Sequence, residues 1–398
     1  MQKKKIVLSV LLLVMGIGIF LVWNTAGRQL VSQMRFEYTE PSPTAPQKES
    51  GENNYETERT TLILREEGSL VDALSVPWDI QKIAEGEWLI TERSGILTHL
   101  KEKGESIRVA ILSQIAQEGE SGLLGIVLHP QFKENKWIYL YQTIQDANGG
   151  GFSNQVVRFR YNEGVLEDEV TIVEDIPGAI YHDGGRIAFG PDGYLYITTG
   201  DATQEDLAQD LSSLAGKILR VSDSGDIPLD NPFGTRVYSY GHRNPQGLAW
   251  DDEGNLWSTE HGRSGLRSGM DELNRIIPGG NYGWPVIEGD EIQEGMIPPV
   301  LHSGPDVTWA PGGLSHKDGH LFWGGLRGQS LYQARIDGKK ASLESVSFQE
   351  KYGRLRTTWI DQEENILYVL TSNDDGRNPK GNSPDKIIRF SLEERVRK

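Results

Sequence analysis

The stretch Asp192-Gly-Tyr-Leu-Tyr-Ile-Thr198 places a turn-forming Asp-Gly pair directly before a short run of aromatic and aliphatic residues. Asp-Gly favours a tight turn, and the run that follows is typical of a buried β-strand. Five similar stretches lie elsewhere in the chain, at 85–91, 134–140, 253–259, 318–323 and 364–370. Their spacing of roughly 45 to 65 residues matches the four-stranded blade of a β-propeller. We therefore predict an all-β, six-bladed β-propeller, with a β-sandwich as the alternative.

The composition is typical of a turn-rich β protein and argues against several classes of function. The chain has 398 residues, of which 46 are glycine, 10 tryptophan and 14 tyrosine. Its net charge of −17 argues against a nucleic-acid partner, because phosphate binding requires the opposite sign. It contains no cysteine, which excludes disulfides, thiolate catalysis and zinc–thiolate sites.

The N-terminus reads as an export segment. Lys3-Lys-Lys5 precedes an apolar run from Ile6 to Trp23, the pattern of a signal peptide or a membrane anchor over residues 1–25. Residues 26–59 contain a stretch rich in proline, serine and charge, which predicts a disordered tether. We expect a hydrophobic helix, then this flexible linker, then the propeller over residues 60–398. The propeller would be extracytoplasmic, either anchored through the N-terminal helix or secreted, with no other membrane contact.

Two polar clusters flank one predicted hairpin. Tyr181-His-Asp-Gly-Gly-Arg186 precedes its first strand, and Thr198-Thr-Gly-Asp201 ends its second. His182 and Asp201 could therefore project from the same end of the sheet. A histidine beside a carboxylate is the usual arrangement of a general base. A structural hydrogen bond between a hairpin histidine and a turn carboxylate is the equally open alternative.

Two arginine-containing stretches favour an anionic ligand. In Tyr240-Gly-His-Arg-Asn-Pro-Gln-Gly247, Arg243 offers a planar, charged donor fork and Asn244 offers both a donor and an acceptor. In Gly353-Arg-Leu-Arg356, the two arginines would share one face of a strand. Such a pair is repulsive unless an anion lies between the two guanidinium groups or solvent screens them.

A third group of stretches is rich in acidic residues and glycine turns. It comprises Thr259-Glu-His-Gly-Arg263, Met270-Asp-Glu-Leu-Asn274 and Gly279-Gly-Asn-Tyr-Gly-Trp284. Carboxylates and backbone carbonyls at tight turns suit an oxygen-seeking cation such as calcium, although purely structural turns have the same pattern. The motifs Gly-x-Ser-x-Gly and His-Glu-x-x-His are absent, so neither a hydrolase nucleophile elbow nor a zincin site is indicated.

Together, these stretches resemble the soluble quinoprotein glucose and aldose sugar dehydrogenases, which are grouped with the sorbosone dehydrogenases. The resemblance covers nearly everything from about residue 65 to 390, and the matching blocks occur in the family's order. Besides the stretches quoted above, the blocks are Val76-Pro-Trp-Asp79, Thr91-Glu-Arg93, Gly122-Leu-Leu-Gly125, His129-Pro-Gln-Phe132, Ala208-Gln-Asp-Leu211, Gly216-Lys-Ile-Leu-Arg220, Asp230-Asn-Pro-Phe233, Asn281-Tyr-Gly-Trp-Pro285 and Tyr368-Val-Leu-Thr371.

The resemblance implies a six-bladed propeller that binds pyrroloquinoline quinone (PQQ) over a calcium ion and oxidises aldoses at the anomeric carbon to lactones. By position, His182 resembles the base that takes the sugar hydroxyl proton, and Asp201 resembles its orienting carboxylate. Arg243 and Asn244 resemble contacts to the quinone, with Arg243 also stabilising developing negative charge. Arg354 and Arg356 match the pair that grips the carboxylates of the cofactor.

The resemblance also implies metal ligands. Gly262 and Arg263 match positions whose backbone carbonyls bind the calcium of the cofactor, although Arg263 stands where a proline is common. Glu272 and Tyr282 resemble the ligands of a separate structural calcium.

Two further cofactor positions depart from the glucose enzyme. Arg327 stands where that enzyme has a lysine, so the charge is kept but the geometry is not. Glu120 stands where a glutamine contacts the cofactor, and it would bring a negative charge close to an anionic ligand.

Three functions follow as hypotheses. The first is a PQQ-dependent aldose dehydrogenase that passes electrons to an external acceptor. The second is a non-catalytic propeller that kept the fold as a binding module. The third is a calcium-dependent propeller lactonase, which would need inward carboxylates around a catalytic metal.

Overall fold

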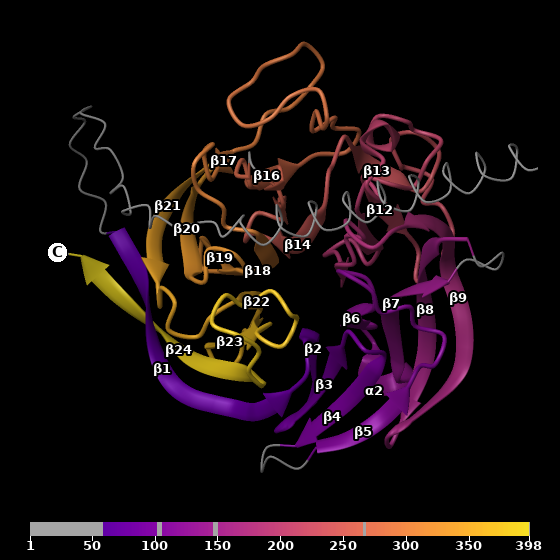
Figure 1. Cartoon of the computed structure of the whole chain (residues 1–398), viewed down its shortest axis with the longest axis vertical. Helices are drawn as coiled ribbons and strands as arrows, with labels where there is room; N and C mark the ends of the chain where they lie inside the picture. Colours follow the sequence, from indigo (N-terminus) through magenta and orange to yellow (C-terminus); the bar gives the residue numbers. More distant parts are fainter. Residues whose placement is uncertain (1–58, 102–105, 146–149, 266–267, 398) are drawn as a thin grey trace, which may run out of the picture. The chain divides into compact units, whose positions relative to one another are not determined.

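The computed structural model describes residues 59–101, 106–145, 150–265 and 268–397. These residues form six four-stranded antiparallel sheets around a common centre, which confirms the predicted six-bladed propeller (Figure 1). The predicted N-terminal helix over 1–25 and the tether lie outside the described residues, apart from Arg59. Within the part of the chain that is described, no helix is long and apolar enough to cross a membrane.

Blades 1 to 5 each consist of four strands in chain order, from the channel outward. The strands of blades 1 and 2 are β2 (Pro77–Ala84), β3 (Glu87–Glu92), β4 (Ile96–Lys101), β5 (Ser106–Ile111), β6 (Leu123–Leu128), β7 (Trp137–Gln145), β8 (Phe152–Asn162) and β9 (Val165–Gly178). Those of blade 3 are β10 (Ile187–Phe189), β11 (Leu195–Thr199), β12 (Lys217–Val221) and β13 (Val237–Tyr240).

Blade 4 consists of β14 (Pro245–Trp250), β15 (Leu256–Glu260), β16 (Glu272–Ile276) and β17 (Leu301–His302). Blade 5 consists of β18 (Pro311–Lys317), β19 (His320–Gly325), β20 (Leu331–Asp337) and β21 (Lys340–Ser347). Two short helical turns interrupt the strands, α2 (Phe132–Asn135) and η1 (Glu205–Ala208).

Blade 6 closes the ring with strands from both ends of the propeller. It contains β22 (Leu355–Asp361), β23 (Ile366–Thr371), β24 (Asp385–Arg397) and, outermost, β1 (Arg59–Leu74). β1 runs antiparallel to β24 from the pair Arg59↔Arg397 to the pair Leu74↔Asp385, and Figure 1 shows the two strands side by side. β1 begins one residue before the expected boundary at residue 60. This pairing joins the two ends of the ring and places β24 inside the sheet of blade 6, with β1 as its outer edge.

Each repeated stretch of the sequence overlaps the second strand of a blade: β3, β7, β11, β15, β19 or β23. A second strand lies inside its sheet and packs against neighbouring blades on both faces. All five residues of β11 and of β15 are buried, for example. The repeat is visible in the sequence because these strands need large apolar residues on both faces.

Candidate active site

His182 and Asp201 lie together at one mouth of the channel, in the loops before β10 and after β11. The Nδ1 atom of His182 is 2.7 Å from Oδ1 of Asp201. The side chain of His182 is 15% exposed and that of Asp201 is 2% exposed. The imidazole therefore reaches solvent while its carboxylate partner is buried.

The backbone around this pair is unusually compact. His182 adopts φ 65°, a left-handed conformation that costs energy for a residue with a side chain. A Cβ atom at Gly200 would lie 1.8 Å from the carbonyl oxygen of His182, so only glycine permits this approach. The glycine in Thr198-Thr-Gly-Asp201 is thus what brings Asp201 against His182.

Further hydrogen bonds fix the orientation of the pair. Oδ1 of Asp201 also accepts the backbone N–H of Thr203 at 2.8 Å, and Oδ2 accepts the indole N–H of Trp284 at 2.9 Å. Because an ionised carboxylate only accepts hydrogen bonds, Nδ1 of His182 carries the proton. In the neutral imidazole Nε2 then keeps its lone pair and can accept a proton from a ligand.

Arg243 and Asn244 join this pair from the loop before β14. The carbonyl of Arg243 accepts the N–H of Asp201 at 2.8 Å, and its guanidinium group lies 5.3 Å from the ring centroid of Trp284. Oδ1 of Asn244 accepts the N–H of Gly184 at 3.0 Å. The loops of blades 3 and 4 are therefore bound to one another around His182.

Arg354 and Arg356 differ in their surroundings. Arg354 precedes β22, so the shared strand face that their spacing suggested does not form. Its Nη2 atom is 2.8 Å from Oδ2 of Asp375, which supplies the counter-charge. Arg356 lies at a register shift of β22 and donates from Nη1 to Oε1 of Gln246 at 3.1 Å. Burial foremost, with the nearby charge of Arg93, lowers the pKa of Arg356 to about 9.

Electrostatic interactions link these groups at the same mouth. Burial acts to raise the pKa of Glu120, whereas charge interactions with His261, Arg377 and His182 and the hydrogen bond from Arg377 lower it. Burial foremost, together with the charge of Arg356 and other neighbouring cations, lowers the pKa of His261 to about 3 despite nearby Glu120. His261 is therefore neutral at neutral pH, and the cation that keeps Glu120 ionised is the permanently charged Arg377.

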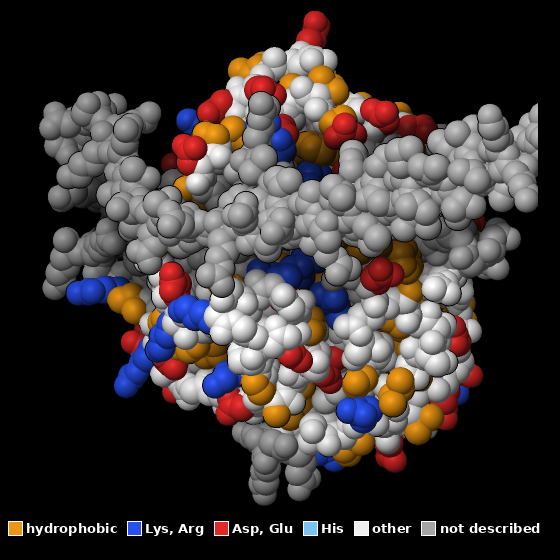
Figure 2. All heavy atoms as spheres, viewed as in Figure 1, with side chains coloured by type: hydrophobic (Ala, Val, Ile, Leu, Met, Phe, Trp, Pro, Cys, Tyr) orange, Lys and Arg blue, Asp and Glu red, His pale blue; other side chains and the backbone are white. Residues whose placement is uncertain are grey.

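Several buried nitrogens of this cluster have no partner among the described residues. They are Arg93 Nε and Nη1, Arg243 Nε, His261 Nε2 and Arg356 Nε. Buried donors are normally satisfied, so a group of unsatisfied ones points to a missing acceptor. Figure 2 shows lysine and arginine side chains gathered near the centre of this face. The arrangement suits an anionic ligand with several acceptor oxygens.

Gly262 and Arg263, predicted to bind calcium through their carbonyls, lie in the loop after β15. The N–H of Gly262 donates to Oδ1 of Asp271 at 2.9 Å. The carbonyl of Arg263 accepts the N–H of Gly269 at 3.4 Å, and its side chain forms an ion pair with Glu288. This loop borders the cluster, because Nη2 of Arg243 donates to the hydroxyl of Ser264 at 3.1 Å.

Glu272 and Tyr282 line a cavity of about 10 Å³ together with Glu260 and Glu288, which is room for about one water molecule or ion. Burial foremost, and then the negative charges of Glu260 and Glu288, raise the pKa of Glu272 to about 8. The hydroxyl of Tyr282 is already engaged, since it donates to the carbonyl of Arg275 at 2.7 Å. Across the described ranges, no group of three or more His, Asp or Glu side chains is arranged to hold a metal ion.

The remaining predicted residue, Arg327, is exposed in the turn after β19. Its neighbour Leu326 contributes its carbonyl to Nη1 of Arg354 at 3.2 Å, so Arg327 lies near the cluster without being buried in it.

Sequence reasoning assigned no role to five residues that the structure brings to this mouth: Arg93, His261, Trp284, Asp375 and Arg377. Three of them lie inside blocks that carried the family resemblance. Asp375 and Arg377 belong to no such block, so no local signal identified them.

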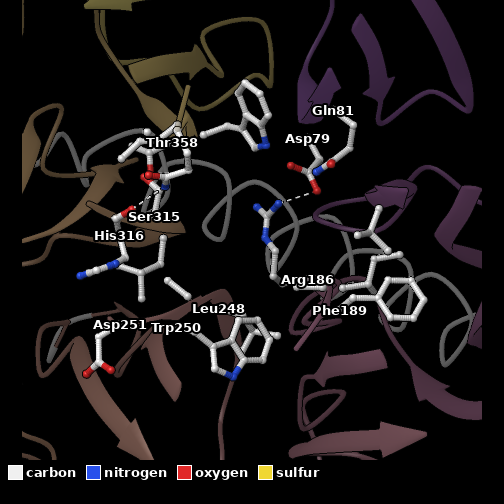
Figure 3. A pocket seen from close by; sticks show the side chains of 18 of the residues that line it. Asp79, Gln81, Arg186, Phe189, Leu248, Trp250, Asp251, Ser315, His316 and Thr358 are labelled. Atoms are coloured by element: carbon white, nitrogen blue, oxygen red, sulfur yellow. Dashed lines mark hydrogen bonds and ion pairs between the residues drawn. The ribbon is translucent and has the colours of Figure 1, made fainter. Parts of the chain in front are cut away.

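The other mouth of the channel is a pocket of about 560 Å³, lined mainly by residues toward the carboxyl ends of the innermost strands (Figure 3). At its inner end Nη1 of Arg186 is 2.6 Å from Oδ2 of Asp79. Arg186 also donates to the carbonyl of Gln246, whose side chain binds Arg356. These contacts lie between the pocket and the cluster around His182.

Comparison with known proteins agrees with this geometry. The model of the Glucose / Sorbosone dehydrogenase family matches residues 74–380. The chain belongs to this family. It is 32% identical over 338 residues to the aldose sugar dehydrogenase YliI of Escherichia coli (strain K12). The aligned region covers 77% of this chain and 90% of the relative. The family is one of dehydrogenases, as the resemblance predicted.

Solved structures of the same family are also similar. The PQQ-bound form of the aldose sugar dehydrogenase from Streptomyces coelicolor aligns with a TM-score of 0.78 and 35% identity, covering 85% of this chain and all of that one. The apo-form of the soluble aldose sugar dehydrogenase from E. coli aligns with a TM-score of 0.73 and 30% identity, covering 83% and 99%.

Proposed function

We propose that this protein oxidises an aldose at its anomeric carbon to the lactone, with PQQ as the first electron acceptor and an external acceptor that receives the electrons afterwards. The observation that carries the proposal is the His182–Asp201 pair beside a group of buried arginine nitrogens without partners. The PQQ-bound form of the relative from S. coelicolor supports the choice of cofactor.

The unsatisfied donors fit an anionic quinone. Guanidinium groups bind carboxylates through paired, charge-assisted hydrogen bonds, and Arg93, Arg243 and Arg356 are all buried. Asn244 adds a neutral amide beside Arg243. Arg354, directly before β22, is held by Asp375 from the loop after β23.

The chemistry of the chain itself is proton transfer and charge stabilisation. Nε2 of His182 accepts the proton of the anomeric hydroxyl, and the carboxylate of Asp201 stabilises the imidazolium that results. PQQ, when bound, supplies the two-electron acceptor for the hydride that leaves the anomeric carbon. The guanidinium group of Arg243 would stabilise the negative charge that develops on a cofactor bound beside it. The aldose thus loses one proton and one hydride.

We extend the proposal to calcium. The carbonyls of Gly262 and Arg263 would bind a calcium ion at the cofactor, and Glu272 with Tyr282 would bind a second. Support comes from Glu260, Glu272 and Glu288, which line a cavity with room for about one ion, although Arg243 lines it too and Arg263 already pairs with Glu288.

The test is a titration of the full chain with PQQ and calcium, followed by turnover of aldoses with an artificial electron acceptor. His182→Ala should keep its PQQ affinity by calorimetry and lose turnover by about 10²- to 10⁴-fold, the range for a general base. His302→Ala, on the outer strand β17, is the matched control and should keep turnover. PQQ binding without turnover of any aldose would contradict the proposal. A folded protein that binds no PQQ would favour the non-catalytic propeller, and lactone hydrolysis without PQQ would favour the lactonase.

A further inference from the structure

A carboxylate lies among the arginines that would hold the anionic cofactor. Glu120 precedes β6, and its side chain is 17% exposed. Its Oε2 atom accepts hydrogen bonds from the backbone N–H of His182 and from Nδ2 of Asn244, both at 3.4 Å. A fixed negative charge at this place would repel an anionic ligand.

Arg377 reaches this carboxylate from the opposite part of the sequence, 257 residues away. Its Nη1 atom donates to Oε1 of Glu120 at 2.8 Å, and its guanidinium group lies 5.4 Å from the ring centroid of Tyr181. The pair joins the loop between β23 and β24 to the loops before β6 and β10. Three blades therefore meet at one ion pair.

The loop that carries Arg377 is itself anchored in the cluster. Asp375 binds Arg354 through its side chain, and its Oδ1 atom accepts the backbone N–H of Arg377 at 3.0 Å. Asp375 has no exposed side-chain surface. Arg377 is thus directed across the mouth by the residue two positions before it.

Both members of the pair are charged in the folded protein. Burial acts to raise the pKa of Glu120, but the ion pair with the permanently charged Arg377 opposes this and favours the carboxylate. Burial acts to lower the pKa of Arg377, but nearby Glu120 raises it above the usual value. The two side chains therefore form one nearly neutral unit, and Glu120 interacts electrostatically with Arg243 and Arg356, whose Nε atoms are unsatisfied.

We propose that Arg377 is a positioning residue of this site: by pairing with Glu120 it cancels a negative charge that would otherwise oppose an anionic cofactor. The inference rests on the proposed function and extends it to a residue outside every matched block. It also gives the glutamate at position 120 a partner.

The test is a double-mutant cycle on PQQ affinity, measured by calorimetry with the full chain and calcium at neutral pH. Arg377→Met removes the charge and keeps an apolar stem, so affinity should fall by about 10-fold or more. Glu120→Gln should bind as tightly as the wild type or more tightly. The double variant should return to within about 3-fold of the wild type, because the charge and its counter-charge are both gone.

Two further arms separate a charge effect from loop anchoring. Arg377→Lys should recover most of the affinity, whereas equally weak binding by Arg377→Met and the double variant would overturn the proposal. The matched control is the exposed pair Arg65–Glu393 on β1 and β24, whose cycle should leave affinity unchanged. If the wild type does not bind PQQ, the proposed function fails. If it binds and Arg377→Met matches it, only this inference fails.

Discussion

Single residues of the candidate active site owe their chemistry to their immediate neighbours. Asp201 has three hydrogen-bond donors around two oxygens, namely His182, Thr203 and Trp284. An asparagine in its place would turn one oxygen into an N–H group that faces another donor. We expect Asp201→Asn to lower turnover by about 10²- to 10⁴-fold by disturbing the orientation and tautomer of His182. PQQ affinity should stay within several-fold of the wild type, and a variant with full turnover would contradict the assigned role.

Asp183 makes a testable contribution to pH-dependent stability. Its Oδ1 atom accepts hydrogen bonds from Asn154 and Ala179, while Oδ2 is buried without a partner among the described residues. Burial raises its pKa from 3.8 to about 7. Between these two values the folded state holds a proton that the unfolded state has lost. Its contribution to stability is therefore complete below about pH 4 and disappears as the pH rises to about 7.

The substitution Asp183→Asn should remove this loss of stability between about pH 4 and pH 7. Urea unfolding of both proteins from pH 4 to 8 should show the stability of the wild type falling, relative to the variant, by up to about 1.4 kcal/mol per pH unit in that window. Other titrating groups are common to both proteins and cancel in the comparison. Parallel stability curves would show that Asp183 is ionised in the folded state throughout.

Residue-level prediction from sequence worked best where glycines and polar side chains lie close together in the chain. His182, Asp201, Arg243 and Asn244 could be proposed from short stretches, and the structure brings them to one mouth. Arg377 could not be proposed, because its partner is 257 residues away and leaves no local pattern.

At the scale of elements, the interior strands were predictable and the loops between them were not. The second strand of each blade is apolar on both faces and repeats visibly. The outer strands need apolar residues on one face only and therefore repeat less clearly. Arg354 lies just before β22 and pairs with Asp375 from the loop after β23, a contact that strand periodicity cannot anticipate.

The pairing of β1 with β24 makes the interior of blade 6 sensitive to mutation. Phe390 in β24 is 1% exposed and packs against Phe348, with ring centroids 4.7 Å apart. Phe390→Ala should reduce the free energy of unfolding by about 3–5 kcal/mol, because it removes a large buried ring and leaves a cavity. Leu229→Ala, at a fully exposed position, is the control and should change it by less than about 0.5 kcal/mol. Equal effects of the two variants in urea denaturation would contradict the described packing.

For the whole molecule, the propeller architecture is what converts scattered loops into one site. The loops before β6, β10, β14 and β22 and the loop after β23 all meet at one mouth, although they span most of the chain. The contacts of Arg186 separate this mouth from the pocket at the other end (Figure 3). A fold prediction was therefore required before any of these residues could be grouped.

Calcium should stabilise the whole propeller if Glu272 binds it. At about 100 times the dissociation constant, a ligand of the folded state adds about 2.7 kcal/mol to the free energy of unfolding. Thermal denaturation with calcium and with a chelator should show this gain in the wild type and not in Glu272→Gln. Glu253→Gln, at an exposed turn, should behave as the wild type. A wild-type protein indifferent to chelation would exclude a structural calcium here.

The central claim is that the buried arginines and His182 form one cofactor site at one mouth of the channel. A crystal structure of the protein with PQQ and calcium tests it most directly. We predict the quinone within hydrogen-bonding distance of Arg243 and Arg356, with Nε2 of His182 facing the space left for the sugar. PQQ bound in the pocket beside Arg186, or away from the channel, would contradict the claim.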